Sequence, residues 1–352
     1  MPSKIEAAAG NGDQAPTAEG VEQLVEAAIA EADTTPMPAV EAQPTVPASP
    51  APGPEKNAKK PPHWATFLTT ASQQEIKVRF AKEASEILTA YGMEQECCIA
   101  LLEPVDSIDS FDLDQIFSAL VHLNPAHDKN VVLFILSRGG EGEPAYQISK
   151  TCKSFASQKF IAVVPRHAKS AATLIAIGAD EIHMGPLGQL GPIDPQIGGL
   201  PALGVSQALK TIASVAELYP KSAEMFARYL RMALTVEQIG YCDRITESAV
   251  QYAERLLSTK PNLVAKAPSI AKQLVHEYKD HNFVIDIAEA QEHLGADWIK
   301  TGTPELQAAE LIYSLFETVN LWLGMMQSKR IVLSGGAGLA QAVKIFDNNK
   351  KQ

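Results

Sequence analysis

From residue 98 to residue 184 the chain alternates between two hydrophobic patterns. Runs in which nearly every residue is apolar, such as 130–136 (NVVLFIL) and 160–164 (FIAVV), indicate strands buried on both faces of a sheet. Between them, apolar residues recur at helical spacing. The expected elements are strands at 98–102, 130–136, 160–164 and 181–184, and helices at 73–91, 112–123, 144–155 and 170–178. Strands that alternate with helices predict an α/β fold with a largely parallel sheet.

After Pro195 the pattern becomes mostly helical. Helices are expected at 205–218, 222–234, 235–239, 247–257 and 304–323, and a short apolar run at 282–285 suggests one more strand. We therefore divide the chain into a tail (1–62), a large folded domain (63–300) and a C-terminal helix with its own tail (301–352).

The first 62 residues differ in composition from the rest. No Phe, Trp or Tyr precedes Trp64, and 11 of the 23 prolines lie before it. Such a stretch buries too little apolar surface to offset chain entropy, so we expect it to be disordered. Residues 20–32 have helical spacing; we interpret them as a transient helix, with folding on a partner as the alternative.

Charge excludes one class of function. The net charge is −11, and residues 1–60 hold nine acidic and four basic side chains. The remainder holds 32 acidic and 26 basic side chains, and neither part has a basic stripe. We therefore expect no binding to nucleic acid.

Targeting and redox signals point to one compartment. We find neither the pattern of a signal peptide nor an 18-residue uncharged apolar run, and residues 309–327 are interrupted by Glu310 and Glu317. The four cysteines, of which two are adjacent, fit no usual metal spacing. We expect a cytoplasmic protein with reduced thiols, no metal and no cofactor, and leave an association with the membrane surface open.

Three segments carry candidate chemistry. The first, 137–142 (SRGGEG), joins a buried strand to a helix. Its glycines allow a sharp turn and leave N–H groups that can bind a phosphate or stabilise an oxyanion. An ordinary strand-to-helix turn is the alternative, and no Gly-Lys-Ser/Thr follows, which excludes a Walker loop.

The second and third segments surround a serine. In 165–173 (PRHAKSAAT), Ser170 lies at the start of an apolar helix, where it can serve as a nucleophile beside free N–H groups or simply as an N-cap. The third, 190–196 (LGPIDPQ), has two prolines and a glycine that fix a rigid loop. There Asp194 either supports a site or satisfies backbone donors.

Together the three segments resemble the serine dehydrogenase proteinase family, a relative of signal peptide peptidase A within the Clp-protease/crotonase superfold. The likeness is carried by VVLFILSRGGEGEPAYQISK, IAVVPRHAKSAATLIAIGADEIHMG and LGPIDPQ, covers about residues 95–200, and is looser to about 300. Despite the family name, the chain has no dinucleotide fingerprint.

The resemblance implies a mostly parallel sheet flanked by helices, a helical C-terminal part and a serine peptidase. Ser170 would be the nucleophile, the N–H groups of Gly140 and Ala171 would hold the oxyanion, and Gly139 would shape the turn. It also implies polypeptide substrates and a homo-oligomer. An unfoldase or membrane-associated partner stays open.

The residue that activates the serine is less evident. Where the Clp subunit has its catalytic histidine, spacing puts Asp194, and a carboxylate is a weak base at neutral pH. Related Ser/Lys peptidases favour a lysine at a helix start. Lys221 is the first candidate and Lys210 the second. His167 is either a base or a pocket residue.

Two other functions fit the same fold. A crotonase-like acyl-CoA enzyme would use the Gly-Gly turn for a thioester oxyanion, but the small residues around Ser170 and the LGPIDPQ segment argue against it. A catalytically inactive interaction protein is the other alternative, since function does not follow from fold alone.

Overall fold

The computed structural model describes residues 63–105, 107–197 and 200–348. The predicted disordered tail and the helix at residues 20–32 lie outside this part of the chain. All elements below belong to one compact unit.

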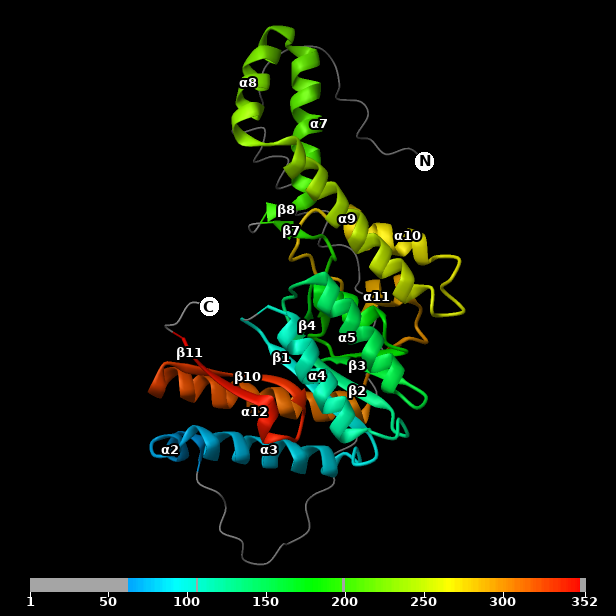
Figure 1. Cartoon of the computed structure of the whole chain (residues 1–352). Helices are drawn as coiled ribbons and strands as arrows, with labels where there is room; N and C mark the ends of the chain where they lie inside the picture. The colour runs from blue at the N-terminus through cyan, green and yellow to red at the C-terminus, as the bar shows by residue number, and fades with distance from the viewer. Residues whose placement is uncertain (1–62, 106, 198–199, 349–352) are drawn as a thin grey trace, which may run out of the picture. The chain divides into compact units, whose positions relative to one another are not determined.

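A mixed sheet forms the centre of this unit, in the order β11-β10-β1-β2-β3-β5-β9 (Figure 1). Five strands run parallel, namely β1 (Cys97–Glu103), β2 (Val131–Ser137), β3 (Phe160–Val164), β5 (Glu181–Met184) and β9 (Ile299–Lys300). At one edge, β10 (Lys329–Gly336) pairs antiparallel with β1, and β11 (Val343–Asp347) pairs antiparallel with β10. The predicted α/β fold with a mostly parallel sheet is confirmed.

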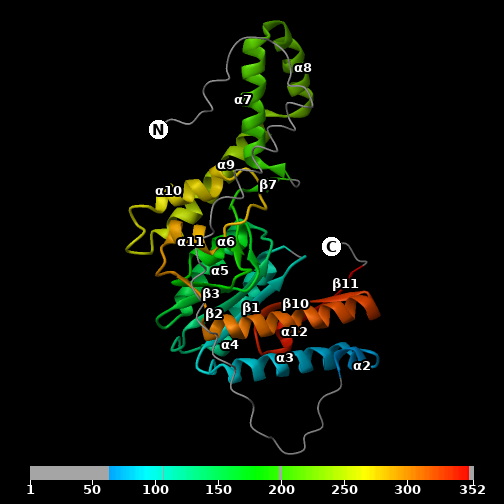
Figure 2. The ribbon, with the colours of Figure 1, turned by 180° about the vertical axis from the view of Figure 1, so that it is seen from behind.

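Helices cover both faces of the sheet. One face is covered by α4 (Ser110–Leu123), α5 (Gly142–Phe155), α6 (Ala171–Ile177), α9 (Val236–Leu257), α10 (Ala267–Lys272) and α11 (Ile287–Leu294). The other face packs against α2 (Trp64–Leu68), α3 (Gln73–Ala90) and α12 (Pro304–Gln327). Figure 2 shows α3 and α12 side by side, as in Figure 1.

The strand β2 shows why these strands read as continuous apolar runs. Leu133 and Ile135 lie in the core on the α5 side, whereas Phe134 and Leu136 lie in the core on the α12 side. Successive side chains of a strand point to opposite faces, so a strand covered on both sides has no polar positions.

Short strands extend the sheet beyond the end of β2. β4 (His167–Ala168) pairs with Ser137 of β2, and β6 (Gln189–Leu190) pairs with β4, both in parallel. A separate pair, β7 (Gln196–Ile197) and β8 (Leu200–Pro201), follows. These pairings bring the three segments with candidate chemistry to one edge.

The C-terminal half differs from the expectation in several places. The helices predicted at 235–239 and 247–257 are one helix, α9, which starts at a capping box of Thr235 and Gln238. Residues 282–285 form no strand; Ile285 makes an isolated bridge to Leu190. The expected tail after α12 contains β10 and β11, whose apolar and β-branched residues (IVL and VKIF) carried a strand signal.

A helical hairpin consists of α7 (Ala202–Leu218), the 3₁₀ turn η1 (Pro220–Ser222) and α8 (Ala223–Ala233). No residue of α8 is buried. The chain then continues into α9, which packs against α6.

The packing of α12 against the sheet yields a test. Phe316 is fully buried in the core between α12 and the sheet, whereas Leu321 on the same helix is 59% exposed. We expect Phe316→Ala to lower the free energy of unfolding by about 3–5 kcal/mol. Leu321→Ala should change it by less than about 0.5 kcal/mol. Urea denaturation of the two variants measures both, and equal effects would contradict this packing.

Candidate active site

A cavity of about 810 Å³ lies where the three segments meet. The SRGGEG turn, the start of α6, the loop after β6 and one side of α9 form its wall. Residues from all of these elements line it, among them Gly140, Ser170, Ala171, Ile193, Tyr252 and His281.

Ser170 sits in a strained turn at the start of α6. Its φ is +52° and its ψ is −120°, a conformation that non-glycine residues rarely adopt. Such strain costs of the order of 1–3 kcal/mol and persists only where the surroundings impose it. Ser170 precedes the helix, yet its side chain makes no capping hydrogen bond. The N-cap alternative therefore does not explain this residue.

Neighbouring hydrogen bonds impose the turn. The Lys169 N–H donates to the Ser137 carbonyl (3.0 Å), and the Leu174 N–H donates to the Ser170 carbonyl (3.1 Å). The Thr173 hydroxyl donates to the Ala168 carbonyl (2.6 Å) and accepts from the Gly191 N–H (3.0 Å). The turn is thus fixed to β2 on one side and to the third segment on the other.

The two glycines of the first segment pack tightly against this turn. Gly139 has φ +111°, and a Cβ there would lie 2.6 Å from Ser170 Cβ and 2.8 Å from the Lys169 carbonyl oxygen. A Cβ on Gly140 would collide with the backbone of Ile108. Only residues without a side chain allow these backbones to approach so closely.

The Gly-Gly turn is held by backbone and side-chain bonds. Ile108 donates its N–H to the Gly139 carbonyl (3.0 Å) and accepts the Glu141 N–H (2.8 Å). The Gly139 N–H donates to Ser137 Oγ (3.1 Å), which in turn donates to Glu103 Oε1 (3.1 Å). Gly139 therefore uses its own N–H in the turn.

Two backbone N–H groups at the cavity have no hydrogen-bond acceptor in the described part of the chain. Within the described part of the chain, neither Gly140 nor Ala171 donates its N–H to another residue. Ala171 is the first residue of α6, so its N–H has no partner inside the helix. Both residues line the cavity beside Ser170, where such donors can hold a developing oxyanion.

At the cavity, the half-buried His281 pairs with the buried Asp194. His281 Nδ1 lies 2.7 Å from Asp194 Oδ1, and the side chains are 21% and 8% exposed. A carboxylate only accepts, so an imidazole that donates to it from Nδ1 would keep a lone pair on Nε2. His281 and Ser170 line the same cavity.

The lysines expected to act as the base lie away from the cavity. Lys221 is exposed in η1 and Lys210 is exposed in α7, and neither lines the cavity. Lys169 is buried, and its amine points to backbone carbonyls. His167 lies in β4 outside the cavity lining; chiefly burial, aided by the charges of Arg138 and Lys169, lowers its pKa to about 4.

His281 is the residue that sequence reasoning passed over. It lies in the loop before α11, far along the chain from Ser170, and no motif surrounds it. His276 and His281 lie five residues apart, which does not match the helical spacing of a metal pair, so spacing gives His281 no role. The one usable signal was Asp194, a carboxylate in a rigid loop near the serine that needed a partner.

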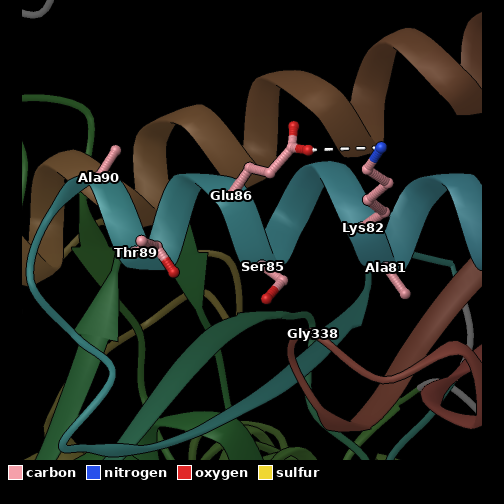
Figure 3. A pocket seen from close by; sticks show the side chains of 7 residues that line it. All are labelled: Ala81, Lys82, Ser85, Glu86, Thr89, Ala90 and Gly338. Carbon is pink, nitrogen blue, oxygen red and sulfur yellow. Dashed lines mark ion pairs between the residues drawn. The ribbon is translucent and has the colours of Figure 1, made fainter.

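Other surfaces offer less chemistry. A hollow on α3 contains the exposed ion pair Lys82–Glu86 at 3.7 Å (Figure 3). Its lining residues are Ala81, Lys82, Ser85, Glu86, Thr89, Ala90 and Gly338, with no histidine or cysteine among them. In the described residues no three His, Cys, Asp or Glu side chains gather as a metal site. None of the helices described is both long and apolar enough to span a bilayer.

Comparison with known proteins gives a match over most of the chain. The sequence profile of the ClpP-like SDH-type serine proteinases matches residues 82–329. Two uncharacterised proteins of Methanocaldococcus jannaschii are 30% identical over 190 residues and 28% identical over 206 residues. These alignments cover 54% and 58% of this chain, and the chain spans 58% and 62% of the two relatives' lengths.

Among solved structures, the chain is similar to two of the 1510-N membrane-bound stomatin-specific protease, one of them in complex with a substrate peptide. Identities are 15% and 16%, both with a TM-score of 0.37, over 63% of this chain and 84% and 80% of those chains. ClpP1 from Listeria monocytogenes is 15% identical with a TM-score of 0.36, over 62% of this chain and 99% of that chain.

Because Gly139 lies so close to Ser170, we expect alanine at this position to destabilise the fold more than alanine at a glycine with free space around it. Gly139→Ala should lower the free energy of unfolding by about 1–3 kcal/mol, because it adds both a strained φ and a clash. Gly142→Ala is the matched control: it is the first residue of α5, and a Cβ there meets nothing within 4 Å. Chemical denaturation compares the two, and similar stabilities would contradict the tight turn.

Proposed function

Because the chain belongs to the family of ClpP-like SDH-type serine proteinases, we propose that it hydrolyses peptide bonds with Ser170 as nucleophile and His281 as base. The observation that carries this proposal is the shared cavity, in which a strained serine at a helix start lies with a histidine paired to a buried carboxylate. In this proposal Asp194 is the partner of the histidine and not the base.

In the acylation step, His281 Nε2 takes the proton of the Ser170 hydroxyl while Oγ attacks the substrate carbonyl carbon. The carbonyl π electrons move to the oxygen, and Asp194 stabilises the imidazolium. When the tetrahedral intermediate collapses, the C–N bond breaks and His281 gives its proton to the leaving amine. The product is an ester between Ser170 and the acyl half of the substrate.

In the deacylation step, water replaces the amine. His281 takes a proton from the water as its oxygen attacks the ester carbonyl, and returns that proton to Ser170 Oγ as the C–O bond breaks. In both steps the N–H groups of Gly140 and Ala171 hold the oxyanion. Donors of this kind are each worth about 10²–10³ in kcat.

The rest of the cavity suits an extended polypeptide. Leu174, Ile193, Ile245 and Tyr252 give it an apolar wall, and Tyr252 is fixed by stacking on Tyr146 with ring centroids 4.6 Å apart. Such a wall favours an apolar substrate side chain next to the cleaved bond.

We also propose that the chain acts as a homo-oligomer. Met225, Tyr229 and Met232 of α8 are 59%, 66% and 90% exposed and recur at helical spacing. Three large apolar side chains on one helix face are unusual on a surface that meets only water. A second copy of the chain is the partner that would cover this face.

The nucleophile and its base are tested with full-length protein. We expect Ser170→Ala, His281→Ala and Asp194→Asn each to lower kcat for a fluorogenic peptide by about 10⁴-fold or more, since these residues act as one unit. A fluorophosphonate probe should label wild-type protein at Ser170 and leave Ser170→Ala unlabelled, as read by mass spectrometry.

Three variants serve as controls. His276→Ala removes an exposed histidine five residues before His281, and Lys210→Ala and Lys221→Ala remove the two lysines that the sequence suggested. All three should keep wild-type activity. Activity that survives in His281→Ala but is lost in a lysine variant would establish a Ser/Lys dyad instead. Activity that survives in Ser170→Ala would refute the peptidase site.

The assembly has its own test. We expect light scattering to give a mass that is a multiple of 37.8 kDa, and Met232→Glu to shift it toward one copy, since a charge would face an apolar partner. Met325→Glu, on the exposed side of α12, is the control and should leave the mass unchanged. A monomeric wild-type protein would contradict this proposal.

A further inference from the structure

Lys169, the residue before the nucleophile, is a buried cation with no acidic partner among the described residues. The residue is 8% exposed, and its Nζ forms no ion pair in that part of the chain. Burying a charge without compensation is costly, so its hydrogen bonds must hold it. Those bonds go to three backbone carbonyls.

These carbonyls belong to the two segments that carry Asp194 and His281. Nζ lies 3.0 Å from the Leu190 oxygen, 2.8 Å from the Phe283 oxygen and 3.5 Å from the Asn282 oxygen. Leu190 begins the loop that leads to Asp194, and Asn282 directly follows His281. An ammonium has three N–H donors, which matches three acceptors.

Other contacts also join these segments around Lys169. Leu190 and Ile285 exchange two backbone hydrogen bonds, of 2.9 and 3.1 Å. A Cβ on Gly191 would lie 2.5 Å from Lys169 Cδ, so the aliphatic stem is packed against that loop. Lys169 thus fills the space between the nucleophile turn and both segments.

We propose that Lys169 is a positioning residue, whose ammonium joins the Asp194 segment to the His281 segment beside the nucleophile. This inference rests on the peptidase function proposed above. Without the ammonium, the carbonyls of Asn282 and Phe283 would lose this donor, and the histidine loop would lose one of its ties to the serine turn.

Lys169 is badly placed to be the base itself. Each of its three N–H groups has a carbonyl acceptor, and the residue does not line the cavity that contains Ser170. A base needs a free lone pair within reach of the hydroxyl. The two roles predict opposite dependence on pH.

The direction of the pH dependence of kcat follows from the charge state of Lys169. Burial lowers the pKa of Lys169 from 10.5 to about 8, and the charge of Asp280 raises it slightly. His167 nearby has a pKa of about 4 and stays neutral in this range, and the other ionisable groups on the contacted segments are Asp194, Asp280 and His281. Above pH 8 the amine keeps two N–H groups, and one carbonyl loses its donor. A positioning ammonium therefore predicts that kcat falls as pH rises through about 8, whereas a lysine base predicts that kcat rises.

Unfolding linked to Lys169 would not produce this fall of kcat above pH 8. The folded protein releases the Lys169 proton near pH 8 and the unfolded chain near pH 10.5, so between them the unfolded state binds more protons. In that window this group makes the folded state more stable as pH rises. A fall in kcat there reflects the site and not unfolding of the chain through Lys169.

The test compares Lys169→Gln with a matched variant, Lys260→Gln, in the full-length protein. Lys260 is also a buried lysine whose amine binds two carbonyls, those of Gly178 and Ala179, and whose pKa burial lowers to about 8. It lies outside the cavity lining. For both variants, kcat and KM are measured from pH 6 to 10, together with hydrogen exchange of peptides covering residues 190–194 and 281–285.

We expect Lys169→Gln to lower kcat about 100-fold with KM unchanged, to remove the decline above pH 8, and to speed exchange in both peptides. Lys260→Gln should keep the decline and the protection of both peptides. A wild-type kcat that rises through pH 8, or a Lys169→Gln variant with wild-type kcat and exchange while Ser170→Ala is inactive, would overturn the inference alone. If Ser170→Ala keeps full activity, the peptidase function fails, and the exchange data still decide whether Lys169 joins the segments.

Discussion

The approach of the Gly139 backbone to the Ser170 backbone sets the geometry of everything around the cavity. β2 and β3 are parallel, so the segments that follow them emerge at the same edge of the sheet. β4 then pairs with the end of β2, which presses the serine turn against the Gly-Gly turn. A Cβ at Gly139 would lie 2.6 Å from Ser170 Cβ, too close to fit without moving the turn. The positive φ of Ser170 is the conformation that this contact leaves, and it directs the hydroxyl away from its capping position.

The two ends of the fully buried short helix α6 differ in their hydrogen bonding. All seven of its residues are buried, so the polar groups at its ends need partners. At the C-terminal end, Lys260 donates to the carbonyls of Gly178 and Ala179 and lies over the ring of Trp298. At the N-terminal end, the Ala171 N–H has no partner within the described chain and faces the cavity lining. One end is satisfied by the protein, and the other is left for an anion, which an oxyanion would supply.

The parts of the fold that sequence predicted best were those with the strongest local signal. The runs NVVLFIL and FIAVV predicted strands covered on both faces, and the glycines and Ser170 lie within a few residues of their ends. β9 has two residues, and its pairing with β5 depends on a contact far away in sequence. The residues of β10 and β11 suit strands, but they follow a long helix, and the sequence pattern predicts a tail there. Lys221 was expected to open a helix, but it lies in the 3₁₀ turn η1 before α8, and α8 buries no residue.

The proposed roles of Asp194 and His281 could not be assigned from spacing. Matching a position to that of a relative does not show which chemical role the residue there has. At the position where the Clp subunit has its histidine, this chain has a carboxylate, which by itself suggested a lysine. A carboxylate can equally orient an imidazole that another segment supplies, and the order of the three residues along the chain is free to vary between unrelated serine hydrolases. The loop before α11 supplies that imidazole here, at 2.7 Å from Asp194. This loop has no strand of its own, so its place depends on the Ile285 bridge and on the amine of Lys169. In the proposed peptidase, this loop must stay tied to the nucleophile turn, and the buried lysine beside the serine provides a chemical means for it.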